Sequence, residues 1–173
     1  MVAETRINDG RETQTSFIMI DAQSVKNSDT TEQKGYDAGK KVSGVKCHIA
    51  VDTNSLPHGI CVTTADVTDR KGARALFSAH REHLSTTLNV LEDGGYAGEK
   101  FAASVQGMLG CPVEIAQRNA LHTVAVIPKR WVAERSFAWL EKCRRLWKNC
   151  ERKIHTSLQM TVLAFAVMIL KRL

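Results

Sequence analysis

The sequence has no apolar run long enough to span a bilayer. Its most apolar stretch, Thr161–Leu170, contains ten residues, whereas a membrane-spanning helix needs about 20. This stretch instead predicts a buried helix that ends at Lys171 and Arg172. The first ten residues are polar and mixed in charge, which is unlike a targeting segment. We therefore expect neither a membrane protein nor a secreted one.

Paired cysteines are missing as well. The five cysteines, at positions 47, 61, 111, 143 and 150, are an odd number and include no Cys-x-x-Cys pair. Reduced thiols in a cytoplasmic protein are the simplest interpretation. His80 and His83 are three residues apart and Cys47 adjoins His48, but neither pair has a second pair at zinc-site spacing. A structural zinc site is therefore not expected.

Positive charge is in excess and is concentrated in one segment. The formal net charge is +6, with a pI near 9.2. Residues 129–153 contain nine Lys or Arg and three Glu, which is a local balance of +6. This excess favours a polyanionic partner. A solvated helix face is the alternative interpretation of such a run.

The hydrophobic pattern alternates between strands and helices, with no repeat, low-complexity tract or linker that would divide the 173 residues. Residues 1–16 predict a loose lead-in to a domain covering 17–173, and residues 24–44 a long loop. Expected strands are 17–21, 45–51, 60–64, 88–92, 112–116 and 123–127, with a hairpin through 54–59. Expected helices begin near 69 and cover about 98–109, the apolar face Ala133, Phe137, Leu140, Cys143 and Trp147, and 156–172. This order predicts an α/β fold, a mixed sheet flanked by helices with a helical C-terminal end.

Three carboxylates stand where a metal site could form. Asp21 ends the first strand, Asp93 ends the strand at 88–92, and Glu134 lies on the basic helix. If the two strands are parallel neighbours, both aspartates lie at the same edge of the sheet. Carboxylates suit Mg²⁺, and a pair of such ions supports in-line displacement at phosphate. The alternatives are turn chemistry at Asp93-Gly94 and a surface pair between Glu134 and Arg130.

Two nearby acids are expected to lie outside that site. An antiparallel partner of the first strand would place Asp52 about 20 Å from Asp21, at roughly 3.4 Å per residue over some six residues. Glu92 adjoins Asp93, and adjacent strand positions face opposite sides of a sheet.

Five segments together resemble bacterial insertion-sequence transposases of the DDE type, in the families numbered four and five. Ile18–Asn27 is similar to the first catalytic segment, and Lys34–Lys41 and His48–Thr53 are similar to segments that follow it. Asp93-Gly94-Gly95-Tyr96-Ala97-Gly98 resembles the second catalytic segment, and Arg130–Leu140 resembles the third. These blocks occur in the family's order and cover nearly the whole chain.

The resemblance implies an RNase H-like catalytic core with Asp21, Asp93 and Glu134 as catalytic acids. They would hold two Mg²⁺ or Mn²⁺ ions, cut double-stranded DNA at the ends of the element, and join the freed 3′-hydroxyl to target DNA. It also implies a bacterial, nucleoid-associated homodimer. Expected contacts to DNA phosphates, combining the resemblance with the basic segments, are Lys26, Lys34, Lys40, Lys41, Arg130, Lys142 and Arg145.

The chain also departs from the family pattern. Ile127 stands where members often have Tyr, and Glu141 where they often have Lys, with Lys142 one residue later. Full members carry N-terminal DNA-binding helices before the first aspartate, so this chain is expected to represent the catalytic part. An inactive remnant that only binds DNA or dimerises is the alternative function.

Two smaller patterns have less specific interpretations. Gly35–Lys41 has three residues between its glycines and Lys in place of the Mg²⁺-binding Ser or Thr, so a nucleotide-binding loop is not expected. Trp131, Trp139 and Trp147 recur every eight residues, about 80° apart on a helix, and form no single stripe. Core packing is expected for most of them, with base stacking as the alternative for an exposed one.

Overall fold

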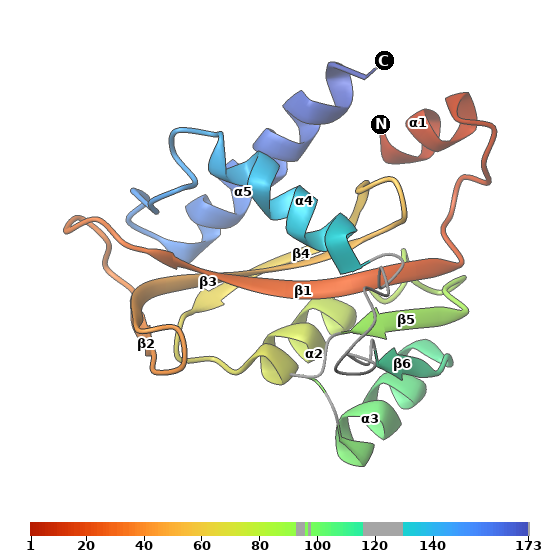
Figure 1. Ribbon diagram of the computed structural model, residues 1–173, viewed down its shortest axis with the longest axis horizontal. Helices are drawn as coiled ribbons and strands as arrows, with labels where there is room; N and C mark the ends of the chain where they lie inside the picture. The colour runs from red at the N-terminus through yellow and green to blue at the C-terminus, as the bar shows by residue number, and fades with distance from the viewer. Residues whose placement is uncertain (93–95, 97, 116–129, 173) are drawn as a thin grey trace, which may run out of the picture.

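The computed structural model describes residues 1–172 apart from 93–95, 97 and 116–129. One mixed sheet forms its centre (Figure 1) and contains β1 (Phe17–Lys26), β2 (Gly35–Asp37), β3 (Val42–Val51), β4 (Pro57–Thr64), β5 (Asn89–Glu92) and β6 (Val113–Ile115). β1 pairs antiparallel with β3 on one edge and parallel with β5 on the other. β3 also pairs antiparallel with β2 and β4, and β5 pairs parallel with β6. The predicted mixed sheet is confirmed.

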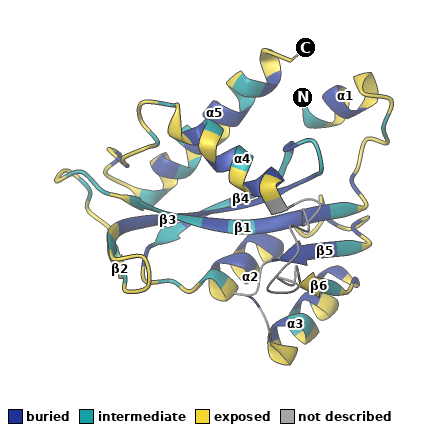
Figure 2. Ribbon diagram, in the orientation of Figure 1, coloured by how far each residue is buried: buried dark blue, intermediate teal, exposed yellow. Residues whose placement is uncertain are grey.

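Helices cover both faces of this sheet (Figure 1). The helices are α1 (Val2–Asn8), α2 (Asp69–Ala79), α3 (Glu99–Leu109), α4 (Arg130–Glu141) and α5 (Ile154–Leu170). One buried cluster joins Met19 and Leu91 of the sheet to Phe137 of α4 and Phe165 of α5. A second cluster on the other face includes residues of β1, β5, α2 and α3. Figure 2 shows buried residues along β1, β3 and β5, between the two layers of helices. No helix in the described residues is long and apolar enough to cross a membrane.

Several predicted boundaries are wrong. The first strand does not end at 21 but runs to Lys26, and the expected loop at 24–44 contains β2 and the start of β3. Residues 1–16 are not loose throughout, because they include α1. The expected strand at 123–127 lies outside the described residues.

The apolar face predicted from Ala133 to Trp147 is correct only for its first part. α4 ends at Glu141, and the chain then turns, so Cys143 and Trp147 lie beyond the helix. Trp147 is 65% exposed and Trp131 is 48% exposed. The expectation that most of the tryptophans pack in the core is therefore wrong.

α2 packs against β3 with no space for a side chain at Gly72. A Cβ atom there would lie 2.0 Å from Cε1 of His48, which is fully buried. The Nε2 atom of His48 is 3.1 Å from the hydroxyl of Thr63, and burial lowers the pKa of His48 to about 4. His48 is thus a buried core residue whose lowered pKa favours the neutral form.

Gly72→Ala is expected to lower the free energy of unfolding by about 1–3 kcal/mol, because the new methyl group must displace the His48 ring. Gly107→Ala is the matched control: it also lies in a helix, and a Cβ there meets nothing within 4 Å. The control should raise stability by about 0.5–1 kcal/mol through helix propensity. Urea unfolding of both variants measures the difference, and equal stabilities would contradict the packing.

Candidate active site

Asp21 lies in the middle of β1, on the face that α4 and α5 cover. Side chains alternate along a strand, so Asp21 faces the same side as Met19 and Gln23. Met19 belongs to the cluster under α4. Asp21 is half-buried, and its Oδ1 accepts a hydrogen bond from the backbone N–H of Ala22 at 2.7 Å. β1 therefore holds this carboxylate between the core and solvent.

Hydrogen bonds near both ends of α4 align this helix with β1. Near its start, the carbonyl of Val132 accepts a hydrogen bond from the hydroxyl of Ser55 at 3.3 Å. Ser55 lies just beyond the end of β3, where Val51 pairs with Met19. At its last residue, Glu141 accepts a hydrogen bond from the amide of Gln23 at 2.5 Å. α4 thus runs along β1 in the same direction as the strand.

Cation–π contacts between aromatic and basic side chains hold α4 in this alignment. The guanidinium of Arg135 lies 4.4 Å from the ring centroid of Trp131 and 4.9 Å from that of Trp139, and it donates to the Ser55 hydroxyl at 2.7 Å. Arg172 lies 4.5 Å from the ring centroid of Trp139. These contacts connect α4 to the turn after β3 and to the end of α5.

Glu134 is exposed and lies on the same side of α4 as Glu141. Seven residues separate the two, and seven steps of about 100° leave them only about 20° apart around the helix. Glu134 is therefore about 10.5 Å before Glu141 along the axis. Asp21 is two residues, about 6.8 Å, before Gln23 along β1. Glu141 contacts Gln23, and Glu134 and Asp21 each precede that contact, one along α4 and the other along β1. The two acids therefore lie near each other along the length of the α4–β1 contact.

The third predicted acid, Asp93, lies outside the described residues. Among those that are described, no group of three His, Cys, Asp or Glu gathers in a way that would hold a metal. Glu92, which precedes Asp93 in the sequence, is 2% exposed and ends β5. By alternation Glu92 shares a face with Val90, in the cluster of α2 and α3, away from α4.

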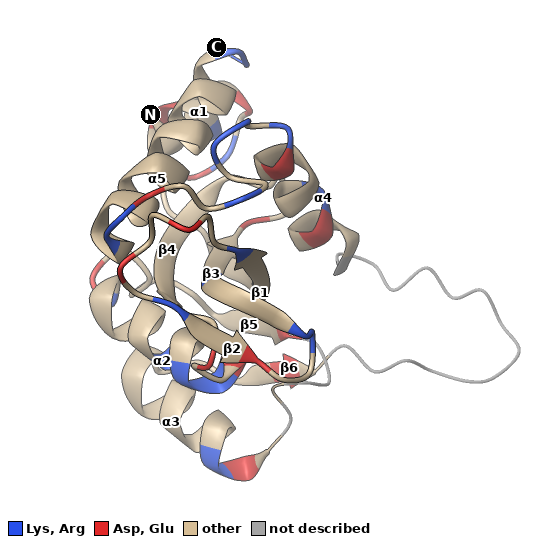
Figure 3. Ribbon diagram, turned by 90° about the vertical axis from the view of Figure 1, so that its left-hand side faces the viewer, with Lys and Arg blue, Asp and Glu red and all other residues tan. Residues whose placement is uncertain are grey.

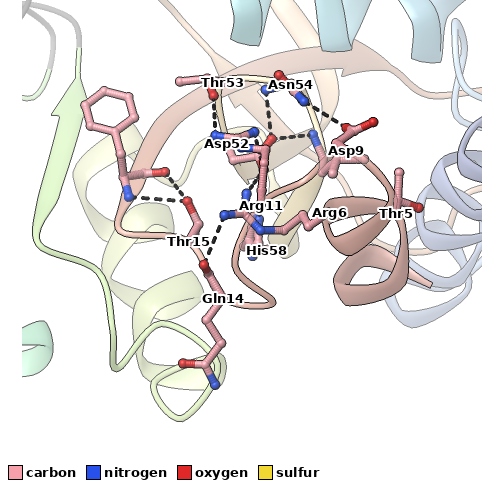
Figure 4. A network of polar contacts seen from close by, with 12 residues as sticks. Thr5, Arg6, Asp9, Arg11, Gln14, Thr15, Asp52, Thr53, Asn54 and His58 are labelled. Atoms are coloured by element: carbon pink, nitrogen blue, oxygen red, sulfur yellow. Dashed lines mark hydrogen bonds and ion pairs between the residues drawn. The ribbon is translucent and has the colours of Figure 1, made fainter.

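Asp52 serves a different purpose, although it is closer to Asp21 than expected. The β1–β3 register pairs Met19 with Val51 and Asp21 with Ile49, so Asp52 lies opposite Ile18. That is three residues from Asp21, or about 10 Å, and the expected 20 Å is wrong because the register was unknown. The carboxylate of Asp52 is fully buried, and partners from the N-terminal segment surround it (Figure 4).

Arg6 of α1 is the closest of these partners, and its Nη1 donates directly to Oδ2 of Asp52. Arg11 and His58 each bring a nitrogen to 3.5 Å from the same oxygen. The backbone N–H groups of Asn54 and Leu56 donate to Oδ1. Burial raises the pKa of Asp52, but the close contact with His58 and the backbone hydrogen bonds outweigh burial and lower it overall.

A family model described as "Transposase DDE domain" matches residues 12–169. The chain belongs to this family. It is similar to a Burkholderia cepacia protein described as a transposase for insertion sequence element IS402. The two are 33% identical over an alignment of 117 residues, which covers 64% of this chain and 55% of that protein. The chain thus spans about half the length of that relative.

A solved structure supports the same assignment of the fold. The chain is similar to one chain in the cryo-EM structure of the simian T-cell lymphotropic virus intasome in complex with the PP2A regulatory subunit B56 gamma. The TM-score is 0.56 and the sequence identity 15%, over 88% of this chain and 47% of that one. At this identity the likeness concerns the fold alone. With the mixed sheet and its flanking helices, it confirms the predicted RNase H-like fold of the DDE domain.

The basic residues expected to contact DNA differ in their surroundings within the DDE domain. Lys26, Lys34, Lys41 and Lys142 are exposed, whereas the side chain of Arg130 lies outside what the structure describes. Arg145 pairs with Glu151 at 2.5 Å. Lys40 donates from Nζ to the carbonyl of Ala22 at 2.9 Å. An ammonium group therefore lies next to the residue that follows Asp21.

Lys46 is a polar core residue of the DDE domain that the sequence pattern did not reveal. It is 5% exposed, and its ammonium contacts Asp37 at 3.0 Å and Asp69 at 2.9 Å. Asp37 also accepts from Ser24 at 2.7 Å and from the backbone N–H of Lys40 at 3.0 Å. The hydrogen bond from Ser24, with those from Lys40 and Lys46, holds the pKa of Asp37 well below its usual range. This network fixes the turn that carries Lys40 against β1.

Proposed function

We propose that this chain catalyses metal-dependent hydrolysis of phosphodiester bonds at DNA ends and strand transfer into target DNA. The catalytic acids in this proposal are Asp21, Asp93 and Glu134, within a catalytic domain covering residues 17–173. The observation that carries it is the shared placement of Asp21 and Glu134 along the contact between β1 and α4. Family membership supplies the reaction class.

The register of the parallel strands supports the inclusion of Asp93. β1 pairs with β5 at Phe17–Asn89, Ile18–Val90 and Met19–Leu91, a constant offset of 72 residues. The same offset separates Asp21 from Asp93. In the proposal, this shared offset makes Asp93 the neighbour of Asp21.

The donor set fits divalent metal. Oxygen ligands from carboxylates are those that Mg²⁺ and Mn²⁺ take, and Glu134 is exposed while Asp21 is half-buried, so water and phosphate have access. We propose that Asp21, Asp93 and Glu134 hold two such ions. When bound, the ions supply a more acidic water and a counter-charge for the phosphate oxygens.

The protein's own residues position the DNA in this proposal. Lys26, Lys34, Lys40, Lys41, Arg130, Lys142 and Arg145 are the proposed contacts to the backbone of double-stranded DNA. Lys40 is the most specifically placed of them, because its ammonium lies beside Ala22. A phosphate at the acids would be within reach of that charge. Arg145 would have to exchange its pairing with Glu151 for phosphate.

An end-labelled duplex tests the proposal. Purified protein with Mg²⁺ or Mn²⁺ should cut or join labelled DNA, and EDTA should stop the reaction. Products should carry a 3′-hydroxyl, which a terminal transferase detects. Absence of metal-dependent cleavage or joining on duplexes that the protein binds would reject the proposed activity.

We also propose a homodimer. α5 leaves Val162, Leu163, Val167 and Leu170 between 44% and 61% exposed, an apolar strip that a second copy could cover. Sedimentation equilibrium should show a dimer that Leu163→Glu converts to a monomer. A wild-type monomer at micromolar concentration would oppose this assembly.

A further inference from the structure

A basic groove lies on the opposite face of the sheet from α4. It has a volume of about 410 Å³ between the first turns of α2 and α3, and its cations are Arg70, Lys71, Arg74 and Lys100. All four are exposed. Among the described residues that line the groove, Glu99 is the one acidic side chain beside these four basic ones. Figure 3 shows basic residues near the starts of both helices.

The start of α2 and the start of α3 lie side by side. A Cβ atom at Gly98 would lie 3.8 Å from Nη1 of Arg70, so that guanidinium lies beside the start of α3. Gly98 caps α3 without a side-chain hydrogen bond. The positive ends of two helix dipoles therefore add to the charge of the four side chains. Phe101, which is 5% exposed, helps to form the floor.

The groove lies near the carboxyl end of the parallel strand β5. α3 follows the carboxyl end of β5, and Figure 1 shows α2 and α3 on the side of the sheet opposite α4. Gly98 is five residues after Asp93, so the chain cannot separate the two by more than about 18 Å. Along one strand of B-DNA that distance corresponds to about five phosphates.

We propose that this groove binds the phosphate backbone of a DNA duplex that continues past the catalytic acids. The inference rests on the proposed function, and it assigns Arg74, Lys100, Lys71 and Arg70 as phosphate contacts in addition to those already proposed. The duplex belongs to the element end or to the target, because both present the same backbone. A charge set without aromatic side chains exposed in the groove suits sequence-independent contact.

Fluorescence anisotropy with a labelled duplex, without metal, tests the groove separately from catalysis. The variant Arg74→Gln/Lys100→Gln should weaken binding about tenfold, and should reduce the slope of log affinity against log salt by about 2. The matched control, Arg81→Gln/Lys171→Gln, removes the same charge from exposed positions outside the groove and should bind like wild type. Thermal melting confirms that both variants are folded.

Activity then distinguishes the two sources of duplex. Loss of cleavage at a labelled end by the groove variant assigns the element end, whereas loss of joining to plasmid alone assigns the target. Equal affinity and salt slope for groove variant and wild type would overturn the inference, as would equal weakening by the control or no binding by wild type. Wild type that binds through the groove but never cleaves would instead reject the proposed activity and leave the groove assigned.

Discussion

Asp21→Asn is expected to reduce metal-dependent strand cleavage by at least about a thousandfold, equivalent to about 4 kcal/mol of transition-state stabilisation. The amide cannot supply the negative charge that draws a divalent cation, although it keeps the size of the side chain. Its carbonyl can still accept the hydrogen bond from Ala22 and the side chain keeps its size, so the variant should remain folded. The rate on an end-labelled duplex, with the melting temperature, measures both.

Asp29→Asn is the matched control, because Asp29 is exposed in the connection after β1. It removes the same charge and should cleave at the wild-type rate. Glu134→Gln should resemble Asp21→Asn, and the double variant should be little worse than either, because the residues act as one unit. Asp21→Asn that cuts as fast as wild type would remove this residue from the site.

Asp52→Ala is expected to lower the free energy of unfolding by about 3–5 kcal/mol at pH 7. The substitution leaves Arg6, which is 4% exposed, buried without its counter-charge. Arg11→Ala should cost far less, because Arg11 is 31% exposed and 3.5 Å from the carboxylate. Arg6→Met/Asp52→Leu should recover part of the loss, since neither charge is then stranded. Urea unfolding measures all of these, and a loss below about 1 kcal/mol for Asp52→Ala would contradict the buried pair.

The same carboxylate gives stability a defined dependence on pH. The folded pKa of Asp52 is lowered, so the folded state favours its charged form. This contribution is fully present above the unfolded pKa of about 3.9 and is lost as pH falls through the folded value. Wild type should therefore lose more stability than Asp52→Ala between pH 5 and pH 2. Parallel losses in the two proteins would show that Asp52 does not carry this dependence.

Local patterns were sufficient for elements whose hydrophobic signal is complete. β5, α2, α3 and α5 lie within two residues of their predicted positions because apolar residues and breakers mark them. Hydrophobic alternation does not predict the second half of β1, because backbone pairing with β3 extends this strand through polar residues. Ser24 and Lys26 are polar, yet they pair with Lys46 and Gly44.

Lys46 and His48 alternate with apolar residues along β3, but α2 covers the face on which they lie. Lys46 is buried because Asp37 and Asp69 neutralise it, and these partners lie 9 and 23 residues away in the sequence. Residues 1–16 show no periodicity, which predicts a loose lead-in, and no local pattern pairs Arg6 with Asp52. The sequence identifies the candidate acids because each ends an apolar run or lies in a family motif. The positions of Asp21 along β1 and of Glu134 along α4 follow only from the strand register and the contacts of α4.

The most direct test of the central claim is an anomalous diffraction map from crystals grown with Mn²⁺. We predict two peaks about 3.5–4 Å apart, each within about 2.2 Å of carboxylate oxygens from Asp21, Asp93 or Glu134. Peaks elsewhere, or an ordered map in which these three carboxylates face separate regions, would contradict the account.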